Sequence, residues 1–113
     1  MKINLPLKPF SINNAWRGGP RYKSTAYLKW LTEGSWLLKG NPRFENEVEV
    51  QINAYMKNYK GRDVDNPIKP TLDLLVAANV LFDDKLVKKV SCEKFKDVDE
   101  RLEITIEEWI EPK

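Results

Sequence analysis

Residues 46–56 alternate between apolar and polar side chains more regularly than any other part of the chain. Val48, Val50 and Ile52 occupy every second position, and polar residues lie between them. Successive side chains of a strand point to opposite faces, so this spacing predicts a β-strand with one buried face. A strand of this kind needs partner strands and a layer that covers its apolar face.

A first helix that could provide this cover is predicted from Ser24 or Thr25, either of which can cap it, to about Lys39. Its apolar residues recur at helical spacing. Gly34 weakens a helix relative to alanine, so this position could bend or break it. The residues Gly40 and Pro42 end it.

A second helix is predicted between Asn66 and Asn79. Asn66 is a favoured N-cap, and Pro67 suits the first helical position because no N–H is needed there. Asn79 stands where helices often end in the left-handed conformation. Lys69 falls in the first turn, where its charge opposes the helix dipole. Its position indicates a role outside the helix, such as pairing with a carboxylate or a phosphate.

Three further strands are predicted at residues 2–6, 86–95 and 101–110. The last two are separated by a short polar turn, which predicts a hairpin. The element order is therefore β-α-β-α-β-β. This order predicts a single α+β domain over residues 1–113, with a small mixed β-sheet and two helices on one face.

The composition excludes several kinds of catalytic and metal site and indicates where the protein is found. The 113 residues include one cysteine, Cys92, and no histidine. Cys–His and Ser–His–Asp nucleophilic sites and histidine-ligated zinc are therefore excluded. A lone cysteine forms no intrachain disulfide, and no apolar stretch matches a signal peptide or a membrane span. We expect a soluble cytoplasmic protein with no membrane partner and no small-molecule cofactor.

Positive charge is concentrated in the first third of the chain, although the formal net charge is only +2. Residues 1–43 contain many Lys and Arg residues and a single acid, Glu33. Within them, residues 7–23 mix basic and aromatic side chains in an irregular segment. This pattern is typical of a loop that contacts a nucleic-acid backbone. For the positive charge, the alternative is a solvated surface that balances acids elsewhere in the chain. For residues 7–23, the alternative is a loop whose aromatic residues cover the core.

Acidic residues flank the second helix: Asp63 and Asp65 precede it, and Asp83 and Asp84 follow it. On an extended chain, residues two apart point the same way, so Asp63 and Asp65 can converge, and the helix can return Asp84 to that point. Three carboxylates repel each other unless a cation lies among them. Oxygen ligands suit Mg²⁺ or Mn²⁺. Capping and turn formation are the alternative role for these acids.

Basic residues in the turn before Asp63 suit a phosphodiester substrate, or they simply neutralise the acids.

The chain as a whole resembles the RusA family of Holliday junction resolvases. The resemblance rests on two segments, residues 5–17 and 62–84. Its motif residues are Leu5-Pro6, Pro9, Ser11-Ile12-Asn13-Asn14, Arg17, Asp63-Val64-Asp65-Asn66, Lys69, Asp73 and Asp83-Asp84. Two departures are Asn79 in place of the usual glycine and a sparser basic run before Asp63.

The resemblance implies a homodimeric, Mg²⁺-dependent endonuclease that cuts four-way DNA junctions symmetrically in DNA recombination and repair, with Mn²⁺ able to substitute. It implies metal binding by Asp63, Asp65 and Asp84, and an active-site role for Lys69. Asp73 and Asp83 would support these residues or be solvated. The implied DNA-contacting residues are Asn13, Asn14, Arg17, Lys60 and Arg62. The alternative is a non-catalytic protein that binds branched DNA and retains a metal site.

Overall fold

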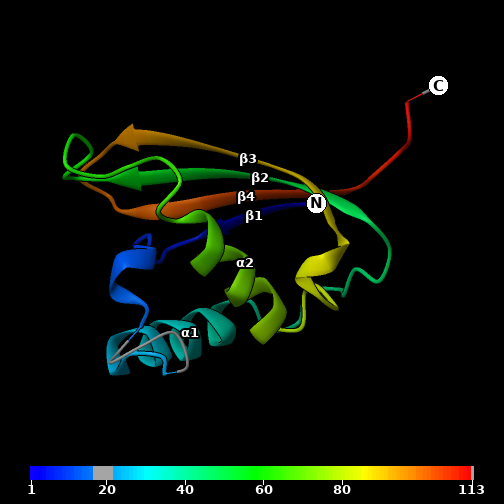
Figure 1. Ribbon diagram of the computed structural model, residues 1–113, viewed down its shortest axis with the longest axis horizontal. Coiled ribbons are helices and arrows are strands. Elements are labelled where there is room, and N and C mark those ends of the chain that lie inside the picture. The colour runs from blue at the N-terminus through cyan, green and yellow to red at the C-terminus, as the bar shows by residue number, and fades with distance from the viewer. Residues whose placement is uncertain (17–21, 113) are drawn as a thin grey trace.

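The computed structural model describes residues 1–16 and 22–112. Four strands form one mixed sheet in the order β1-β4-β2-β3 (Figure 1). β2 pairs in parallel with β3, whereas β4 is antiparallel to both β1 and β2. The strands are β1 (Lys2–Leu5), β2 (Val48–Met56), β3 (Val87–Lys96) and β4 (Arg101–Glu108). The predicted α+β fold and its element order are confirmed.

One face of the sheet is buried, as the alternation predicts. Every second residue of β2 from Val48 to Met56 is buried, and β4 buries three residues in the same way. At the centre, Ile52 lies opposite Ile104 of β4 and Cys92 of β3. Both helices, α1 (Thr25–Leu37) and α2 (Ile68–Ala77), lie on this side of the sheet (Figure 1).

α1 is an unbroken helix. Its N-cap is Ser24, whose Oγ accepts a hydrogen bond from the Tyr27 N–H at 3.1 Å. Gly34 causes no break, and its role lies in packing. A Cβ at this position would lie 2.6 Å from the side chain of Leu74 on α2. Glycine therefore lets the two helices approach closely.

α2 ends as predicted, with Asn79 at a positive φ of 63°. The N–H of Asn79 donates to the Val76 carbonyl, and the N–H of Val80 donates to the Leu75 carbonyl, which is the Schellman pattern. The start of the helix differs from the prediction. Pro67 is the N-cap, and no side chain caps the helix.

The predicted capping role of Asn66 is wrong because a turn precedes the helix. The Asp63 carbonyl accepts from Asn66 N–H, and the Asp65 carbonyl accepts from Ile68 N–H. These backbone bonds take the place of the side-chain cap. The Asn66 carbonyl has another partner, the N–H of Ile12, at 3.0 Å.

The predicted hairpin between β3 and β4 is also wrong, since these strands lie on opposite sides of β2. Their connection passes over the end of β2. The Asp97 N–H donates to the Met56 carbonyl, and the Glu100 carboxylate accepts from the Lys57 N–H. β3 thus becomes an edge strand. Its exposed lysines suit that position because charge discourages pairing with another chain.

Two short 3₁₀ helices complete the fold: η1 (Ile12–Asn14) and η2 (Asp84–Leu86). η1 and η2 both pack against α2. In the described part of the chain, no helix has the length and apolar character needed to cross a membrane.

Candidate active site

The two segments that carry the sequence motifs lie side by side. The bond from Ile12 N–H to the Asn66 carbonyl joins η1 to the turn before α2. A hollow of about 190 Å³ is lined by residues of both segments, among them Ser11, Asn14 and Arg62. Residues about 50 positions apart in the sequence therefore form one continuous surface.

The predicted DNA-contacting residues lie on or next to this surface, except Arg17, which is outside the described residues. Asn13 and Asn14 are exposed at the end of η1. Their backbone is held by side chains: Ser11 Oγ accepts from Asn13 N–H, and Ser24 Oγ donates to the Asn14 carbonyl at 2.7 Å. Lys60 is exposed and Arg62 is half-buried, both in the turn that leads to Asp63.

Lys69 is the centre of an ionic cluster at the first turn of α2. Its Nζ donates to Asp84 Oδ2 at 2.9 Å and lies 2.8 Å from Asp73 Oδ1. The other Asp73 oxygen, Oδ2, accepts from the Tyr27 hydroxyl at 2.5 Å. The predicted pairing of Lys69 with carboxylates is confirmed. Asp73 is not a solvated helix residue, since its side chain is only 19% exposed.

These contacts determine the ionisation of the cluster. Hydrogen bonds from Lys69 to Asp73 and Asp84 raise the pKa of the ammonium group, and the Lys69 bond lowers the pKa of Asp84. Burial, reinforced by Asp73, raises the pKa of Tyr27 well above its usual range. At neutral pH the cluster therefore contains a charged lysine, an ionised Asp84 and a neutral tyrosine that acts as a hydrogen-bond donor.

Asp63 and Asp65 are placed differently. Both are exposed, and the segment from Val64 to Pro67 is a turn, so the expectation of an extended chain is wrong here. Asp65 lies close enough to Cys92 of β3 for its charge to act on the thiol. The pKa of Cys92 rises to about 11, mainly because the thiol is partly buried and to a smaller extent because of the charge of Asp65.

The structure thus brings Lys69, Asp73 and Asp84 together, and leaves Asp63 and Asp65 outside their cluster. Across residues 1–16 and 22–112, no group of three or more acidic, cysteine or histidine side chains is arranged to hold a metal ion. Asp83 has a local role. Its Oδ1 accepts from the Lys85 N–H at 2.8 Å and caps η2, which begins at Asp84.

The sequence analysis did not predict a role for two residues of this region, Tyr27 and Lys94. Tyr27 fits the apolar stripe of α1, and its hydroxyl partner is 46 residues away, so no local pattern marks it. Lys94 of β3 donates to the carbonyls of Tyr59 and Arg62 at 3.1 and 2.8 Å. The sequence did contain a signal for Lys94. At every second position of β3, Val90 and Cys92 are followed by Lys94, so a charged residue breaks the apolar pattern of that face.

This α+β domain thus places basic side chains, whose charge complements a phosphate backbone, beside a group of acids at the start of α2. Comparison with known proteins gives the family. A family model described as endodeoxyribonuclease RusA matches residues 6–107, so the chain belongs to the RusA family. The chain is also 30% identical over 78 residues to the crossover junction endodeoxyribonuclease RusA of Aquifex aeolicus (strain VF5). That match covers 66% of this chain and 61% of the relative.

Proposed function

We propose that this protein is an endodeoxyribonuclease that resolves four-way DNA junctions by hydrolysing phosphodiester bonds. The observation that carries the proposal is the Lys69 cluster. An ammonium group held between Asp73 and Asp84 stands at the helix end next to the turn that contains Asp63 and Asp65. The family match over residues 6–107 supports the same activity.

The cofactor that we propose is Mg²⁺, which Mn²⁺ can replace. The available donors fit such a cation in kind, since Asp63, Asp65 and Asp84 offer carboxylate oxygens and are at least partly open to solvent. These three residues would hold it. When bound, a divalent cation supplies Lewis-acid activation of a phosphodiester.

The chain's own residues supply the remaining chemistry. In hydrolysis, water adds to phosphorus and one P–O ester bond breaks. Lys69 is 49% exposed, so its ammonium can reach a substrate phosphate and stabilise the negative charge that develops there. Asp73 and Asp84 hold that ammonium in place. Lys60 and Arg62, with Asn13 and Asn14 beside them, bind the DNA backbone. The same role is assigned to Arg17.

The test compares a synthetic four-way junction with a linear duplex of the same sequence. We expect symmetric cuts in the junction with Mg²⁺, no cuts in excess chelator, and binding with little cleavage in Ca²⁺. Asp84→Asn protein, purified in the same way, controls for contaminating nucleases. Junction binding without cleavage by the unmodified protein would instead identify a non-catalytic binding protein. Equal activity in chelator would contradict the role of the metal.

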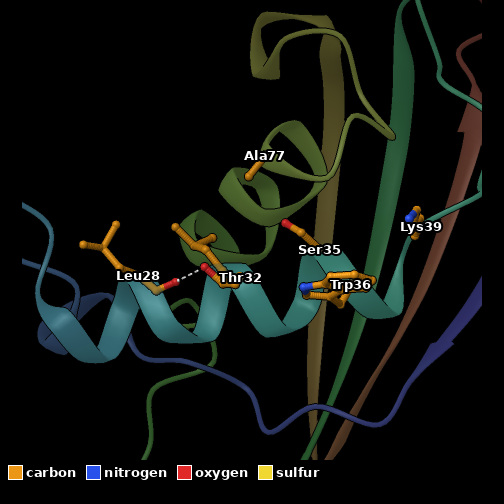
Figure 2. A pocket seen from close by; sticks show the side chains of 7 residues that line it. Leu28, Thr32, Ser35, Trp36, Lys39 and Ala77 are labelled. Atoms are coloured by element: carbon orange, nitrogen blue, oxygen red, sulfur yellow. Dashed lines mark hydrogen bonds between the residues drawn. The ribbon is translucent and has the colours of Figure 1, made fainter.

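We also propose that the protein acts as a homodimer, because two symmetric cuts in a two-fold junction call for two sites related by a two-fold axis. The outer face of α1 offers a surface for this contact. Leu28 and Trp36, two turns apart, are 52% and 69% exposed. They line a hollow of about 400 Å³ that Ala77 of α2 also borders (Figure 2).

Antiparallel pairing of two α1 helices about Thr32 would place Leu28 against Trp36 of the partner subunit. We expect light scattering to give the mass of a dimer at micromolar concentration. Trp36→Glu should shift the protein towards the monomer, because it places a charge in the contact. Val98→Glu is the matched control, since Val98 is also exposed but lies in the β3–β4 connection. A junction-cleaving monomer would contradict the dimer.

A further inference from the structure

Tyr27 lies in the core, but its hydroxyl belongs to the ionic cluster. The ring is fully buried and stacks on Phe10 and Trp30, with centroid distances of 5.1 and 6.2 Å. These contacts determine where the ring lies. The hydroxyl projects from this aromatic group to Asp73 Oδ2 at 2.5 Å. A rigid part of the fold is therefore connected directly to the charged surface.

Asp73 divides its two carboxylate oxygens between different partners. Oδ2 accepts from Tyr27, and Oδ1 contacts the ammonium of Lys69 at 2.8 Å. Hydrogen bonds to an ionised carboxylate are short and strong. With one oxygen held by a buried phenol, the carboxylate has little freedom to rotate. Its second oxygen therefore presents a defined position to Lys69.

Lys69 needs such a constraint. A lysine side chain has a flexible four-carbon stem that can adopt many rotamers, and this one is half exposed. Asp73 holds the ammonium from the helix side and Asp84 holds it from η2. Asp84 is itself 40% exposed, so the Asp73 side is the better anchored of the two.

We propose that Tyr27 is a positioning residue that acts through Asp73 to hold the Lys69 ammonium where it meets the substrate phosphate. The inference rests on the proposed nuclease function. Tyr27 does not touch the substrate. Its contribution is to remove the freedom of Asp73, and hence of Lys69, before DNA binds. Catalytic groups that are held in place in this way lose less on reaching the transition state.

The variant Tyr27→Phe separates this role from packing, because it keeps the ring and removes only the hydroxyl. We expect single-turnover cleavage of a junction in Mg²⁺ to slow about tenfold, a change of the size expected for one hydrogen bond to a charged group. Junction affinity, measured by gel shift in Ca²⁺, should not change. The matched control is Tyr55→Phe, because the Tyr55 hydroxyl also donates to a carboxylate, that of Glu103, at 3.2 Å. The control should cut at the normal rate.

Coupling between residues distinguishes positioning from general stability. In an Asp73→Asn background, Tyr27→Phe should cost far less than in the unmodified protein, because the connection to Lys69 is already broken. A merely structural effect would be the same in both backgrounds. Equal losses, or a normal rate in folded Tyr27→Phe, would overturn the proposal.

A second measurement does not depend on activity. The ¹⁵N signal of the Lys69 ammonium, assigned by its loss in Lys69→Gln, should shift and broaden in Tyr27→Phe and not in Tyr55→Phe. An unshifted signal would refute the positioning role. If the unmodified protein cuts no junction but the signal shifts as expected, the nuclease proposal fails and the coupling of Tyr27 to Lys69 stands.

Discussion

The two acidic parts of the candidate site are built in opposite ways. Asp73 and Asp84 are held by Lys69, and Asp73 is held again by the buried Tyr27. Asp63 and Asp65 lie exposed in a turn, and within the described residues neither carboxylate forms an ion pair. The carboxylates of Asp73 and Asp84 are therefore held by other side chains. Around Asp63 and Asp65, hydrogen bonds hold only the backbone.

This difference reflects the electrostatics of like charges. Carboxylates repel each other at short range unless positive charge lies between them. Lys69 provides that charge for Asp73 and Asp84, so their proximity is part of the fold. Asp63 and Asp65 have no such lysine within residues 1–16 and 22–112. Bringing them to Asp84 therefore requires a cation from outside the chain, which agrees with the proposed Mg²⁺ dependence.

The largest expected effect comes from a substitution of Asp65, one of the two exposed acids. Asp65→Asn keeps the size and one acceptor oxygen but removes the negative charge. If Asp65 holds the metal, junction cleavage should fall by about two orders of magnitude or more. Junction binding in Ca²⁺ should persist or tighten, because one repulsive charge near the phosphates is gone. A cleavage time course beside a gel shift measures both.

A melting curve for Asp65→Asn controls for unfolding. Asparagine serves as well as aspartate in a cap or a turn. A folded variant that cuts at the normal rate would therefore assign Asp65 to turn formation. The Lys69 cluster with Asp73 and Asp84 would then remain as the site.

A smaller effect is expected when the backbone that leads to Asp63 loses its hydrogen bonds to Lys94. Lys94→Met keeps the side-chain stem but removes the ammonium that donates to the Tyr59 and Arg62 carbonyls. We expect a loss of about 1.5–3 kcal/mol in the free energy of unfolding, measured by urea denaturation, because hydrogen bonds to charged groups are worth this much. The exposed Lys96, two residues along β3, provides the control Lys96→Met. Equal stability of the two variants would show that the turn needs no anchor.

The smallest effect should come from the basic residues of the same turn. Lys60→Ala combined with Arg62→Ala should reduce the slope of log affinity against log salt by about 0.9 for each DNA phosphate that is no longer neutralised. Cleavage of bound junction should hardly change, since Lys69 remains. Lys88→Ala with Lys89→Ala, at the start of β3, removes the same charge elsewhere. If that pair flattens the slope instead, DNA binds on a different surface.

Local chemistry in the sequence determined most individual elements. Alternation from Val48 to Met56 defines the strand and its buried face, and Ser24 and Asn79 mark helix ends because their side-chain and backbone preferences act over a few residues. The same is true of Lys69. Its unfavourable position in the first turn of a helix indicated a partner outside the helix dipole, a carboxylate or a phosphate, and Asp73 and Asp84 are the carboxylates that it meets.

Only the tertiary structure decided which elements meet. Alternation shows which face of a strand is buried but not which strand lies beside it, so β3 and β4 were expected to pair although the connection crosses β2. Asp63 and Asp65 were expected to converge, but a turn intervenes. The ring of Tyr27 fits the apolar stripe of a helix, and the bond from its hydroxyl to Asp73 exists only once α1 packs on α2. Such contacts join residues far apart in the chain, where local preferences carry no information.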